Sequence, residues 1–180
     1  SPADLIVTWR HLLGTVRDLK WTLGSVVDTL TQASDTPVLL LPNPGGEHIA
    51  AMTDTQRVMV VTNHLEGDHR LVNWGVHMTH KTGTLTLAHV EDDATIDRVL
   101  NAIGKLPHLN SDVARIELPA KLLQGATDYI NSVTSVLHDH QIQETVVPLV
   151  KLGHALTDYC ALIEEHNVDL LIFNSKDTSQ

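Results

Sequence analysis

Short apolar runs alternate along the chain with segments whose apolar residues recur at helical spacing. The short runs predict strands, and they cover residues 4–8, 36–42, 57–62, 83–90, 146–150 and 168–173. The segments with helical spacing lie around residues 23–30, 71–76, 96–103, 123–137 and 156–163. Strands that alternate with helices predict an α/β fold, an open, mostly parallel twisted sheet with helices on both faces.

A polar stretch at residues 43–56 interrupts this alternation. It begins near a Pro-Gly-Gly sequence and continues with mostly small or polar residues, which is typical of a linker. Residues 1–42 contain a predicted strand, helix and strand, and residues 57–180 contain the other predicted strands. The runs at 3–7 and 168–172 are similar enough to be the same strand of two successive repeats, with chance similarity as the alternative.

The segment from Gly14 to Ser25 connects the first predicted strand to the first predicted helix. The first N–H groups of a helix lack intrahelical acceptors, and the helix dipole favours negative charge beside them. A glycine-bearing loop that leads into a helix is therefore a candidate phosphate site. The alternative is an ordinary turn glycine at position 14 and an ordinary helix start at Gly24 and Ser25.

The charge balance argues against two classes of partner. The chain has 12 Lys and Arg against 22 Asp and Glu, a formal net charge of −10, which opposes attraction to nucleic acid and to anionic lipid. No apolar run approaches the roughly 20 residues of a membrane helix, so we expect no direct membrane insertion. With one cysteine and no signal-peptide pattern, the expected setting is the cytoplasm. The abrupt start at Ser1 suggests an excerpt from a larger parent protein.

The sequence contains 12 histidines, so metal binding has to be considered. Two pairs have suggestive spacing, His77 with His80 and His138 with His140. Neither pair is accompanied by a third ligand at a characteristic spacing, so both are expected to be surface histidines and no metal site is predicted.

Motifs for catalysis are also missing. The sequence has no Walker A loop, no G-x-G-x-x-G and no G-x-S-x-G, which argues against P-loop enzymes, dinucleotide dehydrogenases and serine hydrolases. Cys160 lies with Leu156, Tyr159 and Ile163 in one apolar stripe, so we expect a buried, inert thiol. The protein is therefore not expected to be an enzyme.

Taken in order, these segments resemble the universal stress protein family, whose units contain five strands that alternate with four helices. The first strand, turn and first helix of a unit look like residues 58–63, 66–70 and 74, and the second strand with its His-Val ending looks like residues 85–90. The third-strand exit, third helix and fourth strand resemble Gly153, the helix up to His166 and residues 169–172. Those similar to the fourth strand, fourth helix and fifth strand of a preceding copy are residues 4–7, 23–27 and 37–41.

The resemblance implies a fold like that of the adenine-nucleotide α-hydrolases and a particular domain order. Residues 1–42 would be the end of one repeat, residues 43–56 a linker, and residues 57–180 a second repeat through its fourth strand. An excerpt across the junction of a tandem protein fits this order, and a circularly permuted single domain fits it equally.

The family's nucleotide signature, Gly-x2-Gly-x9-Gly-Ser/Thr, is half present. Gly14, Gly24 and Ser25 match its second half, with Val26 directly after, and His11 replaces the first glycine. An imidazole at that place either blocks the close approach of phosphate or donates a hydrogen bond to it.

The resemblance also implies a nucleoside pocket. The family's acid at the end of the first strand is replaced by Asn63, and Val90 matches the valine at the end of the second strand. We therefore expect ATP or AMP as the ligand of a regulatory module. An apolar sheet edge in a partial repeat predicts association, most simply as a homodimer. The alternative is an interaction or dimerisation module with a degenerate site, part of a larger protein such as a transporter. A slow nucleotide hydrolase ranks third.

Overall fold

The computed structural model describes residues 3–10, 12, 23–42, 55–62, 69–106, 108 and 110–175. The chain divides into two compact units. The first consists of residues 1–53 with 174–180, and the second of residues 54–173. The described part of each unit contains a parallel sheet.

The first unit is built on one strand-helix-strand element. Strand β1 (Ile6–Trp9) pairs in parallel with β2 (Val38–Leu41), and helix α1 (Ser25–Ala33) lies between them in sequence. Parallel neighbours need a long crossover, and the helix lies within that crossover. Val27, 1% exposed, is the buried residue of α1. The strand, helix and strand that the apolar pattern predicts here are confirmed.

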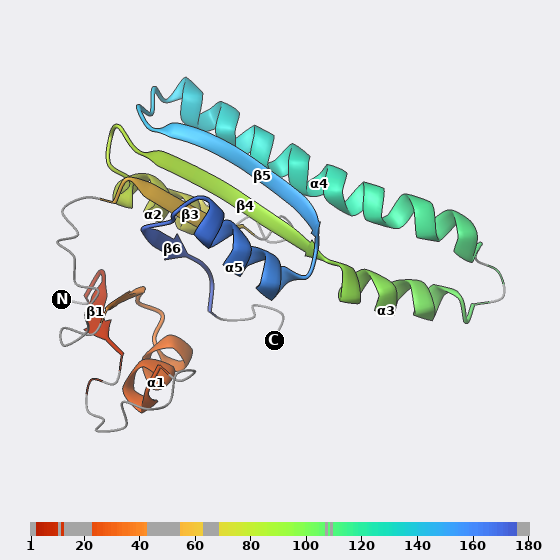
Figure 1. Cartoon of the computed structure of the whole chain (residues 1–180), viewed down its shortest axis with the longest axis horizontal. Coiled ribbons are helices and arrows are strands. Elements are labelled where there is room, and N and C mark those ends of the chain that lie inside the picture. The colour runs from red at the N-terminus through yellow and green to blue at the C-terminus, as the bar shows by residue number, and fades with distance from the viewer. Residues whose placement is uncertain are drawn as a thin grey trace. The chain divides into compact units, whose positions relative to one another are not determined.

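The second unit is a four-stranded sheet in the order β5-β4-β3-β6, with every neighbouring pair parallel (Figure 1). Its elements in chain order are β3 (Arg57–Val61), α2 (His69–Met78), β4 (Thr84–Asp92), α3 (Asp93–Ile103), α4 (Ser111–Asp139), β5 (Thr145–Gly153), α5 (Ala155–Glu165) and β6 (Leu170–Ile172). The predicted α/β fold with a parallel sheet is confirmed.

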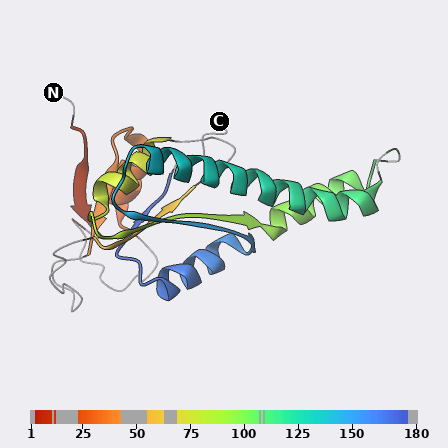
Figure 2. The ribbon, with the colours of Figure 1, turned by 90° about the horizontal axis from the view of Figure 1, so that it is seen from above.

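Helices cover both faces of this sheet, as Figure 2 shows with α2 and α4 on one side and α5 on the other. The alternation of strand residues explains the two layers. Val58 and Val60 of β3 pack in the cluster that includes Ile130 of α4, whereas Met59 packs in the cluster that includes Leu162 of α5. Each strand thus contributes to two cores.

Helix α4 is longer than the sequence pattern predicts, because it begins at Ser111 rather than near residue 123. Pro119 lies inside it, and a proline there normally breaks a helix. The Asn110 side chain caps the helix start by accepting the N–H groups of Asp112 and Val113, and α4 also packs against α3. This cap and this contact hold the part of the helix before the proline, which extends beyond the sheet with α3 (Figures 1 and 2).

The buried face of α5 differs from the predicted stripe. Leu156 is 80% exposed and Cys160 is also exposed, so the expectation of a buried thiol is wrong. Tyr159, Leu162 and Ile163, spaced i, i+3 and i+4, form the face that meets the sheet. Residues 156 and 160 lie to one side of that face, which the spacing of apolar residues alone did not reveal.

No helix in the described part of the chain combines the length and the apolar character needed to cross a membrane.

Candidate functional site

Of the segment that the sequence analysis predicts as a phosphate loop, the structure describes the start of helix α1. Gly24 is the N-cap residue, with φ 94° and ψ 149°, and no side chain caps the helix there. This backbone conformation is nearly restricted to glycine, which explains the residue. The first intrahelical hydrogen bond runs from the Asp28 N–H to the Gly24 carbonyl at 3.0 Å.

This arrangement leaves donors available for an anion. The N–H groups of Ser25, Val26 and Val27 precede the first intrahelical donor, so the helix itself offers them no acceptor. Ser25 is exposed and Val26 is half-buried. The helix start also follows the carboxyl end of β1 along the chain, the usual place for anion binding in a strand-loop-helix element.

In the second unit, the strand order reverses between β3 and β6. The chain builds the sheet outward through β3, β4 and β5, and then returns to place β6 on the other side of β3. In open α/β sheets, ligands bind beyond the carboxyl ends of the strands at such a reversal. The carboxyl end of β3 is therefore the default ligand position of this unit.

A buried network ties the end of β3 to β4. The Thr62 N–H and hydroxyl both donate to the Ala88 carbonyl, at 2.9 and 3.2 Å. The His89 ring lies between the Thr62 carbonyl, 2.8 Å from Nδ1, and the Glu91 carboxylate, 3.1 Å from Nε2. The side chains of His89 and Glu91 are 10% and 13% exposed. These bonds fix the last residue that the structure describes before Asn63.

Val90 is buried, at 5% exposure, and its backbone N–H is bonded by helix α5. Its N–H donates to the Tyr159 hydroxyl oxygen at 2.9 Å. Burial raises the pKa of that hydroxyl above its usual value, the Val90 N–H opposes the rise, and the Glu91 carboxylate adds to it. Tyr159 therefore stays neutral around physiological pH and acts as a structural acceptor.

The predicted site residues fall into three groups. Gly24, Ser25 and Val26 lie together at the start of α1 in the first unit. Val90 lies on β4 in the second unit. His11, Gly14 and Asn63 lie outside the described residues.

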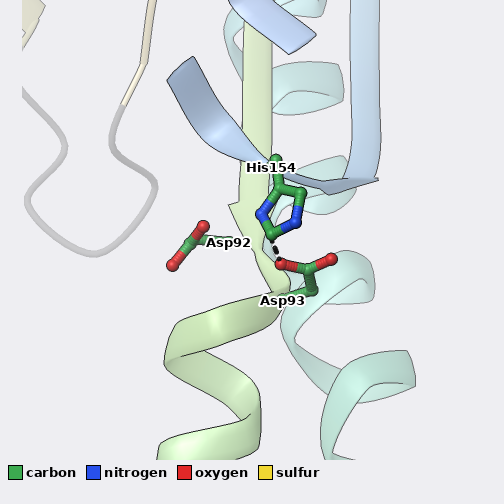
Figure 3. A group of neighbouring side chains, drawn as sticks. All are labelled: Asp92, Asp93 and His154. Carbon is green, nitrogen blue, oxygen red and sulfur yellow. Dashed lines mark ion pairs between the residues drawn. The ribbon is translucent and has the colours of Figure 1, made fainter. Parts of the chain in front are cut away.

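The structure also brings together three side chains that the sequence analysis did not single out, Asp92, Asp93 and His154 (Figure 3). Asp92 ends β4 and Asp93 begins α3, while His154 follows β5 as the N-cap of α5. The parallel register pairs Asp92 with Gly153, so the residues that follow each strand become neighbours. The sequence signal was present in the polar residues that end two consecutive strands of a parallel sheet.

Hydrogen bonds keep the carboxylates around this cluster ionised. Asp92 caps α3 by accepting the N–H and hydroxyl of Thr95 at 3.0 and 2.9 Å, and these bonds lower its pKa, with the Ala155 N–H and His154 contributing. Asp158 accepts the Lys151 ammonium at 2.6 Å, which lowers the pKa of Asp158.

No protein-family model and no curated protein matches the sequence. Solved structures with a similar fold include hypothetical protein MJ0577, at 18% identity over 66% of this chain and 74% of that chain, with a TM-score of 0.49. Protein Rv1636 from Mycobacterium tuberculosis H37Rv matches at 16% identity over 71% and 77%, with a TM-score of 0.44. Hypothetical protein PH0823 matches at 19% identity over 69% and 79%, with a TM-score of 0.41.

Proposed function

We propose that this chain is a universal-stress-protein-like regulatory module that binds an adenine nucleotide, ATP or AMP, without turning it over. Gly24, Ser25 and Val26 would donate backbone N–H groups to the phosphates, together with His11 and Gly14 from the preceding loop. Binding rather than catalysis is proposed because the sequence contains none of the catalytic motifs of P-loop enzymes, dinucleotide dehydrogenases or serine hydrolases.

The observation that carries this proposal is the conformation of Gly24. A helix start without a side-chain cap, behind a glycine at φ 94°, presents several N–H groups to an anion. The rest of the sequence match, nine residues between Gly14 and Gly24 and Ser25 directly after Gly24, supports the assignment of this helix start to a nucleotide signature. In the second unit, the carboxyl end of β3 is a separate candidate ligand position, because the strand order reverses there.

A second candidate function is an interaction module that forms a homodimer and binds no nucleotide. Two sequence departures favour it, His11 in place of a glycine and Asn63 in place of an acid. The large exposed apolar side chains Ile116 and Leu156, 77% and 80% exposed, are also compatible with a surface for a partner.

Calorimetric titration with ATP and AMP separates the two candidates. We expect saturable heat for the unaltered chain and co-purified nucleotide in its mass spectrum. Gly24→Ala should weaken binding strongly, because a Cβ strains this backbone conformation by about 1–3 kcal/mol and crowds the phosphate. Gly104→Ala is the matched control, since Gly104 has an ordinary helical φ of −61° and the added Cβ would have no atom nearer than 3.5 Å.

Two results would contradict nucleotide binding at this loop. The first is the absence of heat at millimolar ligand from a folded chain without co-purified nucleotide, which would leave the interaction module. The second is equal affinity of the Gly24→Ala and Gly104→Ala variants, which would place the phosphates elsewhere.

A further inference from the structure

The cluster of Asp92, Asp93 and His154 has a mixed donor set drawn from two strand ends. One ligand atom from each residue lies within 4.8 Å of the other two, and Figure 3 shows the three side chains gathered where β4 and β5 end. An imidazole nitrogen with carboxylate oxygens is a donor set that divalent transition metals accept readily, whereas Ca²⁺ and Mg²⁺ prefer oxygen alone.

Asp93 and His154 are in direct contact within this cluster. Asp93 Oδ1 lies 3.0 Å from His154 Nδ1, yet this oxygen is shielded from water and has no hydrogen-bond partner among the described residues. Two atoms bound to one tetrahedral Zn²⁺ at about 2.0–2.2 Å are themselves roughly 3.3–3.6 Å apart. The two donor atoms therefore lie within a few tenths of an ångström of the spacing of neighbouring ligands, without the geometry of a hydrogen bond.

The charged groups around the cluster favour a divalent cation. Lys151 is paired with Asp158 at 2.6 Å, so that carboxylate is neutralised. Asp92 and Asp93 remain as the two carboxylates beside His154. The starts of α3 and α5 oppose a cation through their dipoles. That opposition is reduced because Asp92 accepts N–H groups of Thr95 and Ala155, and Asp158 accepts that of His154.

We propose that Asp92, Asp93 and His154 form a binding site for a divalent transition metal of the Zn²⁺ class. His154 supplies the nitrogen ligand, and Asp93 and Asp92 supply one oxygen each. Asp92 uses a lone pair beside those that cap α3, because a carboxylate has about four acceptor positions. Three protein ligands leave a coordination position open, as in zinc sites that also hold water or an exogenous ligand.

The test is a calorimetric titration of the full chain with Zn²⁺ alone, after dialysis against a chelator and without nucleotide. We expect one saturable event that His154→Ala removes and that Asp93→Asn weakens about tenfold or more. His138→Ala is the matched control, because the His138 side chain is 91% exposed and has only a 4.0 Å contact with Asp139. Co²⁺ substitution should give the visible absorption of a coordinated ion in the unaltered chain and lose it in His154→Ala.

Asp92 is left unaltered in this test because its cap supports α3, and circular dichroism checks the fold of each variant. If His154→Ala does not fold, the comparison of Asp93→Asn with the unaltered chain decides. The proposal is overturned if the unaltered chain shows no saturable event, or if the His154→Ala or Asp93→Asn variant binds as the unaltered chain does. The proposal is also overturned if His138→Ala lowers the Zn²⁺ affinity as much as His154→Ala and Asp93→Asn do. None of these results bears on nucleotide binding, so the two proposals fail separately.

Discussion

The Tyr159 hydroxyl oxygen, on α5, accepts the backbone N–H of Val90, on β4, at 2.9 Å. Tyr159→Phe keeps the packing of the ring but leaves this N–H without an acceptor in a buried place. We expect the free energy of unfolding to fall by about 1–3 kcal/mol, measured by urea titration. Leu156→Ala, an 80% exposed position on the same helix, is the control and should change stability by less than about 0.5 kcal/mol. Equal losses in the two variants would show that the hydrogen bond does not stabilise the fold.

The same hydroxyl predicts how stability depends on alkaline pH. Burial raises the folded-state pKa of Tyr159, so above about pH 10 the unfolded chain loses this proton while the folded chain keeps it. The contribution is therefore fully present below about pH 10 and is lost as the pH rises toward the folded-state pKa. Urea midpoints measured through this range should fall less steeply in Tyr159→Phe. A variant whose midpoints fall as steeply as those of the unaltered chain would contradict the assignment.

Asp169 connects the start of β6 to the start of β3. Its carboxylate accepts the backbone N–H groups of Gln56 and Arg57, at 3.1 and 2.8 Å, and the Arg57 guanidinium at 2.8 Å. Asp169→Ala should lower the free energy of unfolding by about 1–3 kcal/mol, because it removes charge-assisted hydrogen bonds to backbone groups. Asp139→Ala removes a carboxylate that is 78% exposed, and it should have little effect in the same urea titration. If Asp169→Ala and Asp139→Ala lowered the free energy of unfolding equally, the hydrogen bonds of Asp169 would not stabilise the fold.

Gly75 allows α2 to approach the sheet closely. A Cβ at this position would lie 2.6 Å from Val60 Cγ2 and 2.9 Å from Leu85 Cδ1, both in the core. Gly75→Ala should therefore lower the thermal midpoint, with about 1–3 kcal/mol of overpacking outweighing the better helix propensity of alanine. A Cβ at Gly104 would meet its nearest atoms at 3.5 Å or more, which is ordinary van der Waals contact, so Gly104→Ala should leave the midpoint unchanged or raise it. If Gly75→Ala instead raises the midpoint, the close approach is not needed.

The order and type of the elements could be predicted because each strand and helix carries its own apolar pattern. The runs at 57–62 and 83–90 became β3 and β4 nearly residue for residue. Helix α4 was predicted only in part, because the stretch before residue 123 was read as polar and the contact with α3 that supports it is not local. The exposed Cys160 was missed because spacing alone does not say which side of a helix meets a sheet.

The same division applies to the candidate sites. The sequence by itself determined the α/β fold, because the periodicity of apolar residues is a local property of the chain. It also determined where α1 begins, because the positive φ of Gly24 is a local property that favours glycine. Only the tertiary structure decided that Asp92 and Asp93 meet His154, about 60 residues further along. The register of β4 against β5 brings them together, and register depends on how the whole sheet buries its two faces.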